Sequence, residues 1–254
     1  MSNIQNLELC WQVEAACAAA WPAEQIQSCQ GFEFRQTVGT KSRRINSVNP
    51  TFQHQPVDAK LLDAATNFYA ACDQNTVFRV PEMISELDNI LDLNHFDEAQ
   101  ARTKTLLAPT MSGFEWQQDV QITTHPEDRW LQFALERADF SADSHVWFRQ
   151  ALLNIGYPIL FAHIEEDQEL AAIAYAVVIG DIAIVESVET APKFRRQGRA
   201  AKLLSSLLAK CKRLGATKAA LQVVAQNTAA RALYKKLGFS TELYDYHYRT
   251  KPIK

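Results

Sequence analysis

A strand, a glycine turn and an amphipathic helix follow one another between Ile182 and Leu214, and this order constrains the fold more than any other feature. The apolar segment Ile182–Thr190 predicts a strand, and Arg196–Leu214 predicts a helix. A further strand is expected at Lys218–Val224 and a further helix at Thr228–Leu237. The apolar residues that recur at helical spacing in the longer helix are Ala200, Leu203, Leu204, Leu207 and Leu208. Strands that alternate with helices predict an α/β or α+β sheet domain.

The chain, at 254 residues, is long enough for two domains with separate cores. Residues 1–118 carry eight basic and fourteen acidic side chains, whereas residues 119–254 carry eighteen and fifteen. This contrast predicts two units with different roles. The short, irregular segment Pro109–Trp116 is the expected linker, which gives domains over residues 1–115 and 116–254.

The first half repeats the predicted order of the second half. Asn46–Val48 corresponds to Glu186–Val188, and Ala59–Leu62 is identical in sequence to Ala201–Leu204. The shared order of elements indicates an internal duplication. In the first half we expect a hairpin of two strands at Phe32–Val38 and Arg43–Val48, helices at Asp58–Cys72 and Met83–Asn94, and further strands at Thr76–Val80 and Gln100–Ala108. In the second half we expect further helices at Glu127–Arg137 and Ala142–Ile155, and further strands at Asp119–His125, Tyr157–Glu165, Leu170–Val178 and Leu243–Arg249.

A basic stretch from Thr190 to Thr241 holds twelve Lys or Arg residues and no Asp or Glu, in a chain of net charge −3. Near its start, Gly198 permits a tight turn that opens the helix. The free backbone N–H groups and the dipole at such a helix start favour a phosphate-bearing ligand. The residues expected to bind it are Arg195, Arg196, Gln197, Gly198, Arg199 and Ala200. The alternative is a plain loop-to-helix junction with solvated arginines.

Two motifs in this stretch resemble those of the GNAT superfamily of acyl-CoA-dependent N-acetyltransferases. The first is Pro192-Lys193-Phe194-Arg195-Arg196-Gln197-Gly198-Arg199-Ala200, which is similar to the family's pyrophosphate loop. The second comprises the motif residues Asn227, Ala230, Leu233, Tyr234, Gly238 and Phe239. The resemblance covers residues 119–250. It implies a mixed, mostly antiparallel twisted sheet flanked by helices, with a catalytic domain over 116–254. The first half, which lacks a glycine loop, looks like a degenerate copy or a substrate-recognition domain, so that the chain is a tandem pair.

The resemblance also implies acetyl-CoA as the co-substrate and a primary amine of a small molecule or peptide as the acceptor. The strand that ends at Thr190 should separate from the strand that begins at Lys218. The pantetheine arm would then bind backbone groups near Val188 and Thr190, and Asn227 would contact the same arm. The diphosphate would lie on residues 196–200. A protein that binds acyl-CoA without catalysis is the alternative function.

Tyr234 is the expected general acid, which would protonate the departing thiolate of coenzyme A. Its alternative role is that of an amphipathic core tyrosine. For the base, the strand offers Glu186 and Glu189, which a period of two places on opposite faces. Glu186 then shares its face with Val188 and Thr190, and we favour it. The other possible bases are His163, His247 and a chain of water molecules.

The segment Arg43–Pro50 is the most distinctive part of the first half. Its two arginines could bind a substrate carboxylate, because guanidinium groups pair with carboxylates in bidentate geometry. The alternative, which we favour, is a strand end whose Asn and Ser side chains satisfy local backbone groups.

Composition restricts the remaining possibilities. Five scattered cysteines without a CxxC pair favour reduced thiols in a cytoplasm over a disulfide framework or a metal site. No run approaches the length of a membrane span, and Glu8 and Glu14 favour an N-terminal helix over a signal peptide. The acidic net charge argues against a nucleic-acid partner. We expect a cytoplasmic monomer or homodimer without a bound metal.

Overall fold

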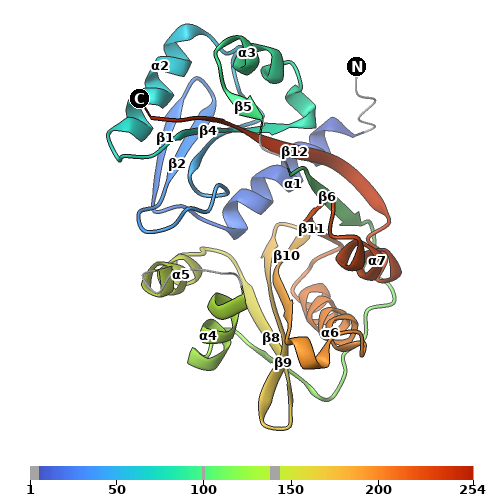
Figure 1. The fold of residues 1–254 in the computed structure, drawn as a ribbon. Coiled ribbons are helices and arrows are strands. Elements are labelled where there is room, and N and C mark those ends of the chain that lie inside the picture. Colours follow the sequence, from blue (N-terminus) through green and yellow to red (C-terminus); the bar gives the residue numbers. More distant parts are fainter. Residues whose placement is uncertain (1–5, 99–100, 138–143, 254) are drawn as a thin grey trace. The chain divides into compact units, whose positions relative to one another are not determined.

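A computed structural model describes residues 6–98, 101–137 and 144–253, which form two compact units (Figure 1). The first unit comprises Met1–Lys104, Val224–Gln226 and Leu243–Lys254, and the second comprises Thr105–Val223 and Asn227–Glu242. The boundary after Lys104 thus precedes the expected linker at Pro109–Trp116. The last strand of the chain belongs to the first unit. Because Val224–Gln226 and Leu243–Lys254 belong to the first unit, neither unit is continuous in sequence.

The first unit has the strand order β1-β2-β3-β4-β12, with β5 paired to β12. Its neighbouring strands are antiparallel, except that β3 and β4 are parallel. The strands are β1 (Gln25–Cys29), β2 (Phe32–Gln36), β3 (Ser47–Pro50), β4 (Thr76–Pro81), β5 (Asp97–Glu98) and β12 (Thr241–Lys251). The helices are α1 (Leu7–Ala20), α2 (Ala59–Ala70), a 3-10 turn at Glu82–Ile84 and α3 (Leu87–Leu93). Phe34, Leu61, Tyr69 and Phe78 are fully buried in the core of this unit.

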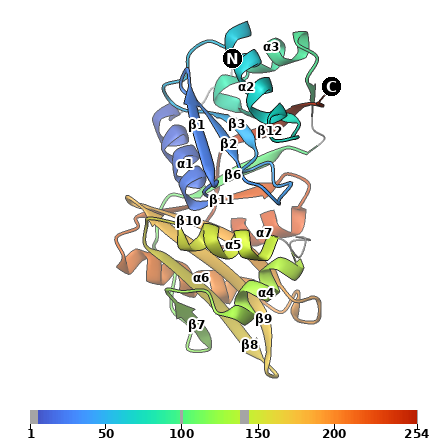
Figure 2. The same ribbon diagram turned by 90° about the vertical axis from the view of Figure 1, so that its left-hand side faces the viewer.

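The second unit has the strand order β6-β11-β10-β9-β8-β7. Strands β7 to β10 form an antiparallel meander, whereas β10 and β11 are parallel. Helices α4 and α5 lie on one face of this sheet and α6 on the other, as Figures 1 and 2 show. The strands are β6 (Thr103–Ala108), β7 (Val120–Thr123), β8 (Ile159–Glu166), β9 (Glu169–Ile179), β10 (Ile182–Thr190) and β11 (Lys218–Val224). The helices are α4 (Asp128–Arg137), α5 (Ser144–Leu153), a 3-10 turn at Pro192–Phe194, α6 (Arg199–Arg213) and α7 (Thr228–Lys236).

Both units contain the same arrangement of strands around one crossover helix. In the first, β2 and β3 are antiparallel and α2 connects β3 to the parallel strand β4. In the second, β9 and β10 are antiparallel and α6 connects β10 to the parallel strand β11. The corresponding sequence segments lie at equivalent places. Ser47 and Val48 belong to β3 and Asn46 directly precedes it, whereas Glu186–Val188 lies in β10. The tandem order predicted from the sequence is confirmed at this level.

Several expected boundaries were wrong. The strand expected at Arg43–Val48 lies at Ser47–Pro50, because the residues before it form a loop. Strand β1 was not predicted, since four of its five residues are exposed and it has no apolar alternation. The helix expected at Met83–Asn94 is divided into a 3-10 turn and α3. The expected starts of a strand at Gln100 and of a helix at Ala142 lie outside the described residues.

A buried ion pair stabilises the first unit. Arg79 on β4 donates to both carboxylate oxygens of Glu14 on α1, at 2.5 and 2.8 Å, and the Tyr244 hydroxyl donates to the same carboxylate at 2.6 Å. Burial alone would raise the pKa of Glu14, but the charge and hydrogen bonds of Arg79 and Tyr244 hold that pKa below its ordinary value. The carboxylate is therefore ionised and fully engaged in the folded protein.

Replacing Glu14 with Gln should lower the free energy of unfolding by about 3 kcal/mol, because it leaves the guanidinium of Arg79 buried without a counter-charge. Urea unfolding measures this change, and Glu8→Gln on the exposed face of α1 is the matched control. In the native protein, the contribution of the ionised Glu14 to the free energy of unfolding is present at neutral pH. It is lost as the pH falls through the depressed folded pKa. Equal stability of the two variants would contradict the structural role of the pair.

Candidate functional site

The loop after β10 has the conformation of an anion-binding turn. Arg196 has a φ of +60° and Gly198 a φ of +80°, and α6 begins at Arg199 instead of at Arg196 as expected. The first helical hydrogen bond joins the Lys202 N–H to the Gly198 carbonyl at 3.1 Å. Within the described chain, the backbone N–H groups of residues 196–201 have no protein acceptor. Consecutive free N–H groups at a helix start bind phosphate groups.

Two side chains of this loop hold its shape. Arg195 donates through Nε to the Thr190 carbonyl at 3.1 Å, which ties the loop to the end of β10. Gln197 donates to the Lys193 carbonyl at 2.9 Å. Both residues therefore have a positioning role in addition to any contact with a ligand. The side chain of Ala200, in the first turn of α6, is small and partly exposed, and leaves the helix start open.

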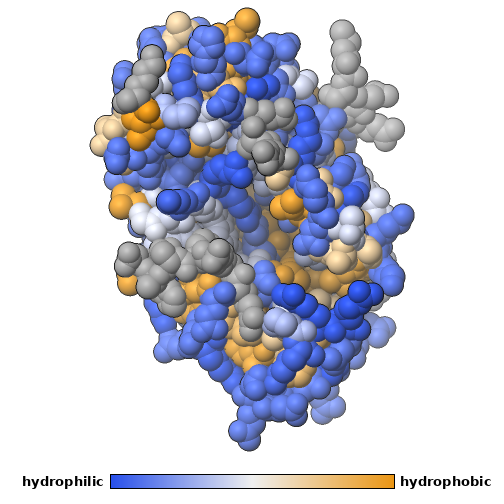
Figure 3. Space-filling model, viewed as in Figure 1, coloured by the Kyte–Doolittle hydropathy of each residue, from blue (hydrophilic) through white to orange (hydrophobic). Residues whose placement is uncertain are grey.

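Carboxylates from other segments neutralise much of the basic stretch. Arg199 forms a bidentate pair with Glu166 at 2.6 and 2.8 Å, and Lys202 pairs with Asp119 at 2.5 Å. Three further ion pairs of the stretch are Lys193–Glu169, Lys218–Asp181 and Arg231–Glu242. Figure 3 shows the strongly hydrophilic side chains around α6. Arg199, one of the residues expected to bind the phosphate, is thus already paired with a carboxylate, whereas the Arg196 side chain is exposed in the loop.

Strands β10 and β11 separate beside this loop, as the family resemblance implied. Their parallel pairing runs from Ile182 with Lys218 to Val185 with Leu221, and no pair follows in the described parts of either strand. The rest of β10, which includes Val188 and Thr190, has backbone groups on this side that do not pair with β11. An extended ligand can add to such a strand edge through backbone hydrogen bonds.

A β-bulge in β10 changes the face of the sheet to which its side chains point. Glu186 pairs with Tyr175 and Glu189 pairs with Ile173, so three steps on β10 correspond to two on β9. Ser187, within the bulge, has a φ of +49°. Because Tyr175 and Ile173 share one face of β9, Glu186 and Glu189 also share one face. The expectation that they point to opposite faces was wrong, and Glu186 does not share its face with Thr190, which pairs with Ala172.

Tyr234 lies near both glutamates. It projects from α7, whose start Asn227 caps by accepting the Ala230 N–H at 3.1 Å. Its ring packs edge-on against Phe239, with ring centroids 6.0 Å apart, and 7% of the residue is exposed. Burial, and then the negative charges of Glu189 and Glu186, raise the pKa of the Tyr234 phenol. The hydroxyl therefore keeps its proton, and in the described structure no protein group accepts it.

The two histidines that the sequence offered as bases have other partners. His163 is buried on β8, and its Nε2 lies 3.2 Å from Nη2 of Arg129. Burial lowers its pKa. His247 belongs to the first unit, where its Nε2 lies 2.7 Å from a carboxylate oxygen of Asp88.

The segment Arg43–Pro50 satisfies local backbone groups, which is the alternative we favoured. Asn46 accepts the Thr37 N–H at 2.8 Å and donates to the Thr40 carbonyl at 3.0 Å. Ser47 donates to the Arg43 carbonyl at 2.7 Å. These contacts account for the polar residues of the segment, although not for its arginines.

Burial raises the pKa of the Cys211 thiol on α6 to about 12, so that this thiol is not a nucleophile at neutral pH.

Across residues 6–98, 101–137 and 144–253, no cluster of three or more His, Cys, Asp or Glu side chains is arranged to hold a metal ion. No helix in these ranges is long and apolar enough to cross a membrane.

Comparison with known proteins identifies the fold and the family. Residues 10–249 match the family described as "Probable histone acetyltransferase Rv0428c C-terminal". The chain is 24% identical to the "Uncharacterized N-acetyltransferase YobR" of Bacillus subtilis, over 94% of this chain and 98% of that protein. It is 30% identical to the "[Ribosomal protein bS18]-alanine N-acetyltransferase" of Escherichia coli, over 42% of this chain and 78% of that protein.

Solved structures share the fold over most of the chain. A GCN5-related N-acetyltransferase from Kribbella flavida superposes with a TM-score of 0.69 and 15% identity, over 98% of this chain and 97% of that one. A tandem GNAT protein from the clavulanic acid biosynthesis pathway superposes with a TM-score of 0.63 and 11% identity, over 81% and 74%. The glycine turn at the start of α6, the separated strands and these matches agree. The chain therefore belongs to the Rv0428c C-terminal acetyltransferase family and is an N-acetyltransferase of the GNAT superfamily.

Proposed function

We propose that the protein transfers an acetyl group from acetyl-CoA to a primary amine of a small molecule or peptide, by direct attack of the amine on the thioester. One observation supports this most: the phosphate-binding turn, the unpaired edge of β10 and a protonated tyrosine lie in one unit. The comparisons support an amine of a peptide as the acceptor. The description of the matching family names histone, and the relative from Escherichia coli is named for an alanine of a ribosomal protein.

The turn and the strand edge would bind the co-substrate. The backbone N–H groups of residues 196–200 take the diphosphate, and the pantetheine arm pairs with the backbone near Val188 and Thr190. Asn227, whose Oδ1 caps α7, has its amide nitrogen as a donor to the same arm. A backbone N–H of this part of β10 donates to the thioester oxygen as negative charge develops.

Tyr234 and Glu186 would move the protons. Glu186 accepts a proton from the amine as the new N–C bond forms, because the attacking nitrogen then becomes acidic. When the C–S bond breaks, Tyr234 donates its hydrogen bond and then its proton to the thiolate. The phenol holds its proton more tightly than a free thiol of pKa about 8.5 does. The leaving thiolate is therefore first stabilised by a hydrogen bond from the phenol. The proton on Glu186 returns through solvent and restores Tyr234.

The base assignment predicts unequal effects of two similar substitutions. Glu186→Gln should lower kcat/KM for the amine about 100-fold, because proton removal is lost while the shape is kept. Glu189→Gln, on the same face and also near Tyr234, is the matched control and should lower it less than tenfold. Steady-state kinetics with a fixed amine measure both. A larger loss in the Glu189 variant would transfer the role to that residue, and two small losses would favour a water chain.

The charged side chains of the glycine turn predict unequal effects of two further substitutions on acetyl-CoA binding. Arg196→Gln should weaken acetyl-CoA binding about tenfold, because the exposed side chain adds positive charge beside the turn. Arg199→Gln should have a smaller effect on affinity, because Glu166 already neutralises that guanidinium. Isothermal titration calorimetry at low salt compares the two. The reverse order would show that Arg199 leaves Glu166 to bind the ligand.

A thiol-release assay tests the proposed reaction. The protein is incubated with acetyl-CoA and a panel that contains peptides with free N-termini, lysine side chains and small amines. Release of coenzyme A that depends on the amine, with an equal amount of acetylated product by mass spectrometry, is the expected result. Thiol release that is independent of every amine would contradict an amine acceptor.

A further inference from the structure

The turn between β8 and β9 places two glutamates side by side. Asp167 and Gln168 have φ values of +52° and +62°, which is the conformation of a two-residue hairpin turn. Glu166 and Glu169 are directly paired at the end of this hairpin, so their side chains project from the same face of the sheet. Two like charges in this position repel each other, and each carboxylate needs a cation nearby to offset the repulsion.

The two cations come from the two ends of the glycine turn. Arg199, the first residue of α6, donates to both carboxylate oxygens of Glu166, at 2.6 and 2.8 Å. Lys193, in the 3-10 turn before the loop, has its Nζ 2.7 Å from a carboxylate oxygen of Glu169. The two glutamates, which we call the carboxylate fork, therefore hold a residue on each side of the loop 194–198.

The glycine turn needs support from outside because its own conformation is unfavourable. Arg196 has a φ of +60°, and a residue with a side chain adopts this left-handed conformation less readily than the right-handed one. In the described chain the backbone N–H groups of residues 196–201 bond to no protein acceptor, so they do not hold the turn in shape. A site that is held in its bound conformation beforehand binds its ligand more tightly.

Given the proposed function, on which this role rests, we propose that Glu166 is a positioning residue that holds the glycine turn ready for the diphosphate of acetyl-CoA. Glu166 acts through Arg199, and Glu169 assists it through Lys193. The fork keeps the start of α6 and the 3-10 turn at one separation, so that the free N–H groups stay in the arrangement that receives the diphosphate. When only a fraction of the molecules has this arrangement, the apparent dissociation constant rises in inverse proportion to that fraction.

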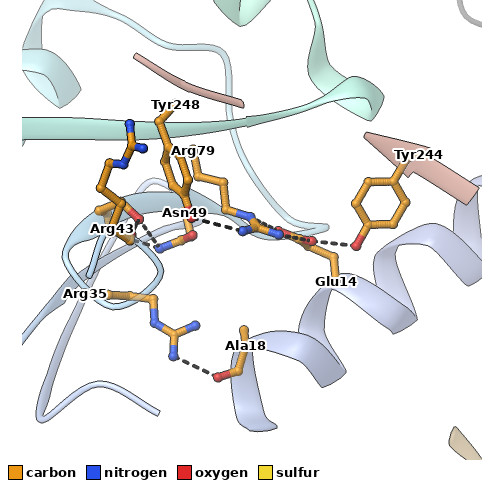
Figure 4. A network of polar contacts seen from close by, with 9 residues as sticks. Glu14, Ala18, Arg35, Arg43, Asn49, Arg79, Tyr244 and Tyr248 are labelled. Atoms are coloured by element: carbon orange, nitrogen blue, oxygen red, sulfur yellow. Dashed lines mark hydrogen bonds and ion pairs between the residues drawn. The ribbon is translucent and has the colours of Figure 1, made fainter. Parts of the chain in front are cut away.

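The exposure of the two pairs sets the size of the expected effect. The side chains of Arg199 and Glu166 are 26% and 34% exposed, and those of Lys193 and Glu169 are 48% and 62% exposed. The Glu14 side chain in the ion pair of the first unit, which Figure 4 shows, is only 8% exposed. Exposed ion pairs contribute less than buried ones, and a bidentate pair contributes more than a single contact. We therefore expect a moderate effect from Glu166 and a smaller one from Glu169.

Calorimetric titration with acetyl-CoA, together with steady-state kinetics, tests the role of Glu166. Glu166→Gln should weaken binding about threefold and leave kcat at saturating acetyl-CoA unchanged, because the ligand itself restores the turn. Added to Arg199→Gln, it should cause no further loss, since the two residues act as one pair. The matched control is Glu165→Gln, which removes the same charge from the opposite face of the sheet, where Glu165 accepts a hydrogen bond from Arg129 of α4 at 2.8 Å. This control should keep the wild-type affinity.

Limited digestion with trypsin in the absence of acetyl-CoA measures the hold on the turn independently of the coenzyme. Cleavage after Arg195 and Arg196, followed by mass spectrometry, should be about threefold faster in Glu166→Gln than in the wild type, and Glu165→Gln should match the wild type. If wild-type protein binds no acetyl-CoA while this difference in cleavage is present, the proposed function is refuted and the hold of the fork on the turn is supported.

Equal cleavage in Glu166→Gln and the wild type would overturn the proposal. Unchanged affinity of Glu166→Gln for acetyl-CoA would overturn it as well. Tighter binding in that variant would also contradict it, because Arg199, once released, would then bind the diphosphate itself. An equal loss of affinity in Glu165→Gln would show that net charge, and not the position of the turn, controls the affinity.

Discussion

Gly198→Glu should weaken acetyl-CoA binding at least 100-fold. Gly198 has a φ of +80° and forms the N-cap of α6, directly among the free N–H groups of the turn. A Cβ at this position meets no atom within 4 Å, so a clash inside the protein is not the cause. The loss arises because a carboxylate would lie where the diphosphate is proposed to bind, and because an L-residue strains a left-handed turn. Isothermal titration calorimetry measures the affinity.

Two alanine variants separate strain from charge. Gly198→Ala introduces the strain without the charge and should weaken binding by about tenfold or less. Gly215→Ala places the same kind of strain, at a φ of +102°, after the other end of α6, where a Cβ also has open space. It should lower stability and leave the affinity for acetyl-CoA unchanged. Unchanged affinity in Gly198→Glu would refute the assignment of the turn.

Tyr234→Phe should lower kcat by 100-fold to 1000-fold with little change in the KM for acetyl-CoA. Phenylalanine keeps the edge-on packing against Phe239 and removes only the hydroxyl that is proposed to donate to the leaving thiolate. Because burial raises the pKa of Tyr234, the wild-type rate should not fall near pH 10, where a free phenol would lose its proton. Rates measured from pH 6 to 10 test both statements.

The control for this substitution is Tyr157→Phe, which removes an exposed hydroxyl from the same unit. Its kcat should equal that of the wild type. A Tyr234 variant with full activity would show that solvent protonates the thiolate. A raised KM at constant kcat would instead assign Tyr234 to binding.

The elements that carry the motifs could be predicted from the sequence because local rules specify them. Strands Ile182–Thr190 and Lys218–Val224 have the predicted bounds, since each is an apolar run between turn residues. The separation of β10 and β11 followed from the resemblance and is confirmed. The start of α6 was misplaced by three residues because the left-handed conformation of Arg196, which is not a glycine, has no signal in the sequence.

The relative placement of the acidic side chains could not be predicted. A bulge at Ser187 inserts one residue into β10, and a period of two cannot show where that insertion falls. The ion pairs of the basic stretch were missed for a related reason. Glu166 and Asp119 are distant in sequence from Arg199 and Lys202, and only the folded sheet brings them together.

The most direct test is transfer of a labelled acetyl group from acetyl-CoA to an amine, with wild type, Gly198→Glu and Tyr234→Phe compared under saturating amine. The proposed function predicts labelled amide product from the wild type. It predicts product from the glycine variant only at high acetyl-CoA concentration, and slow product from the tyrosine variant at every concentration. The contradictory result is tight binding of acetyl-CoA with wild type and Tyr234→Phe equally inert toward every amine, as expected of a protein that only binds the coenzyme.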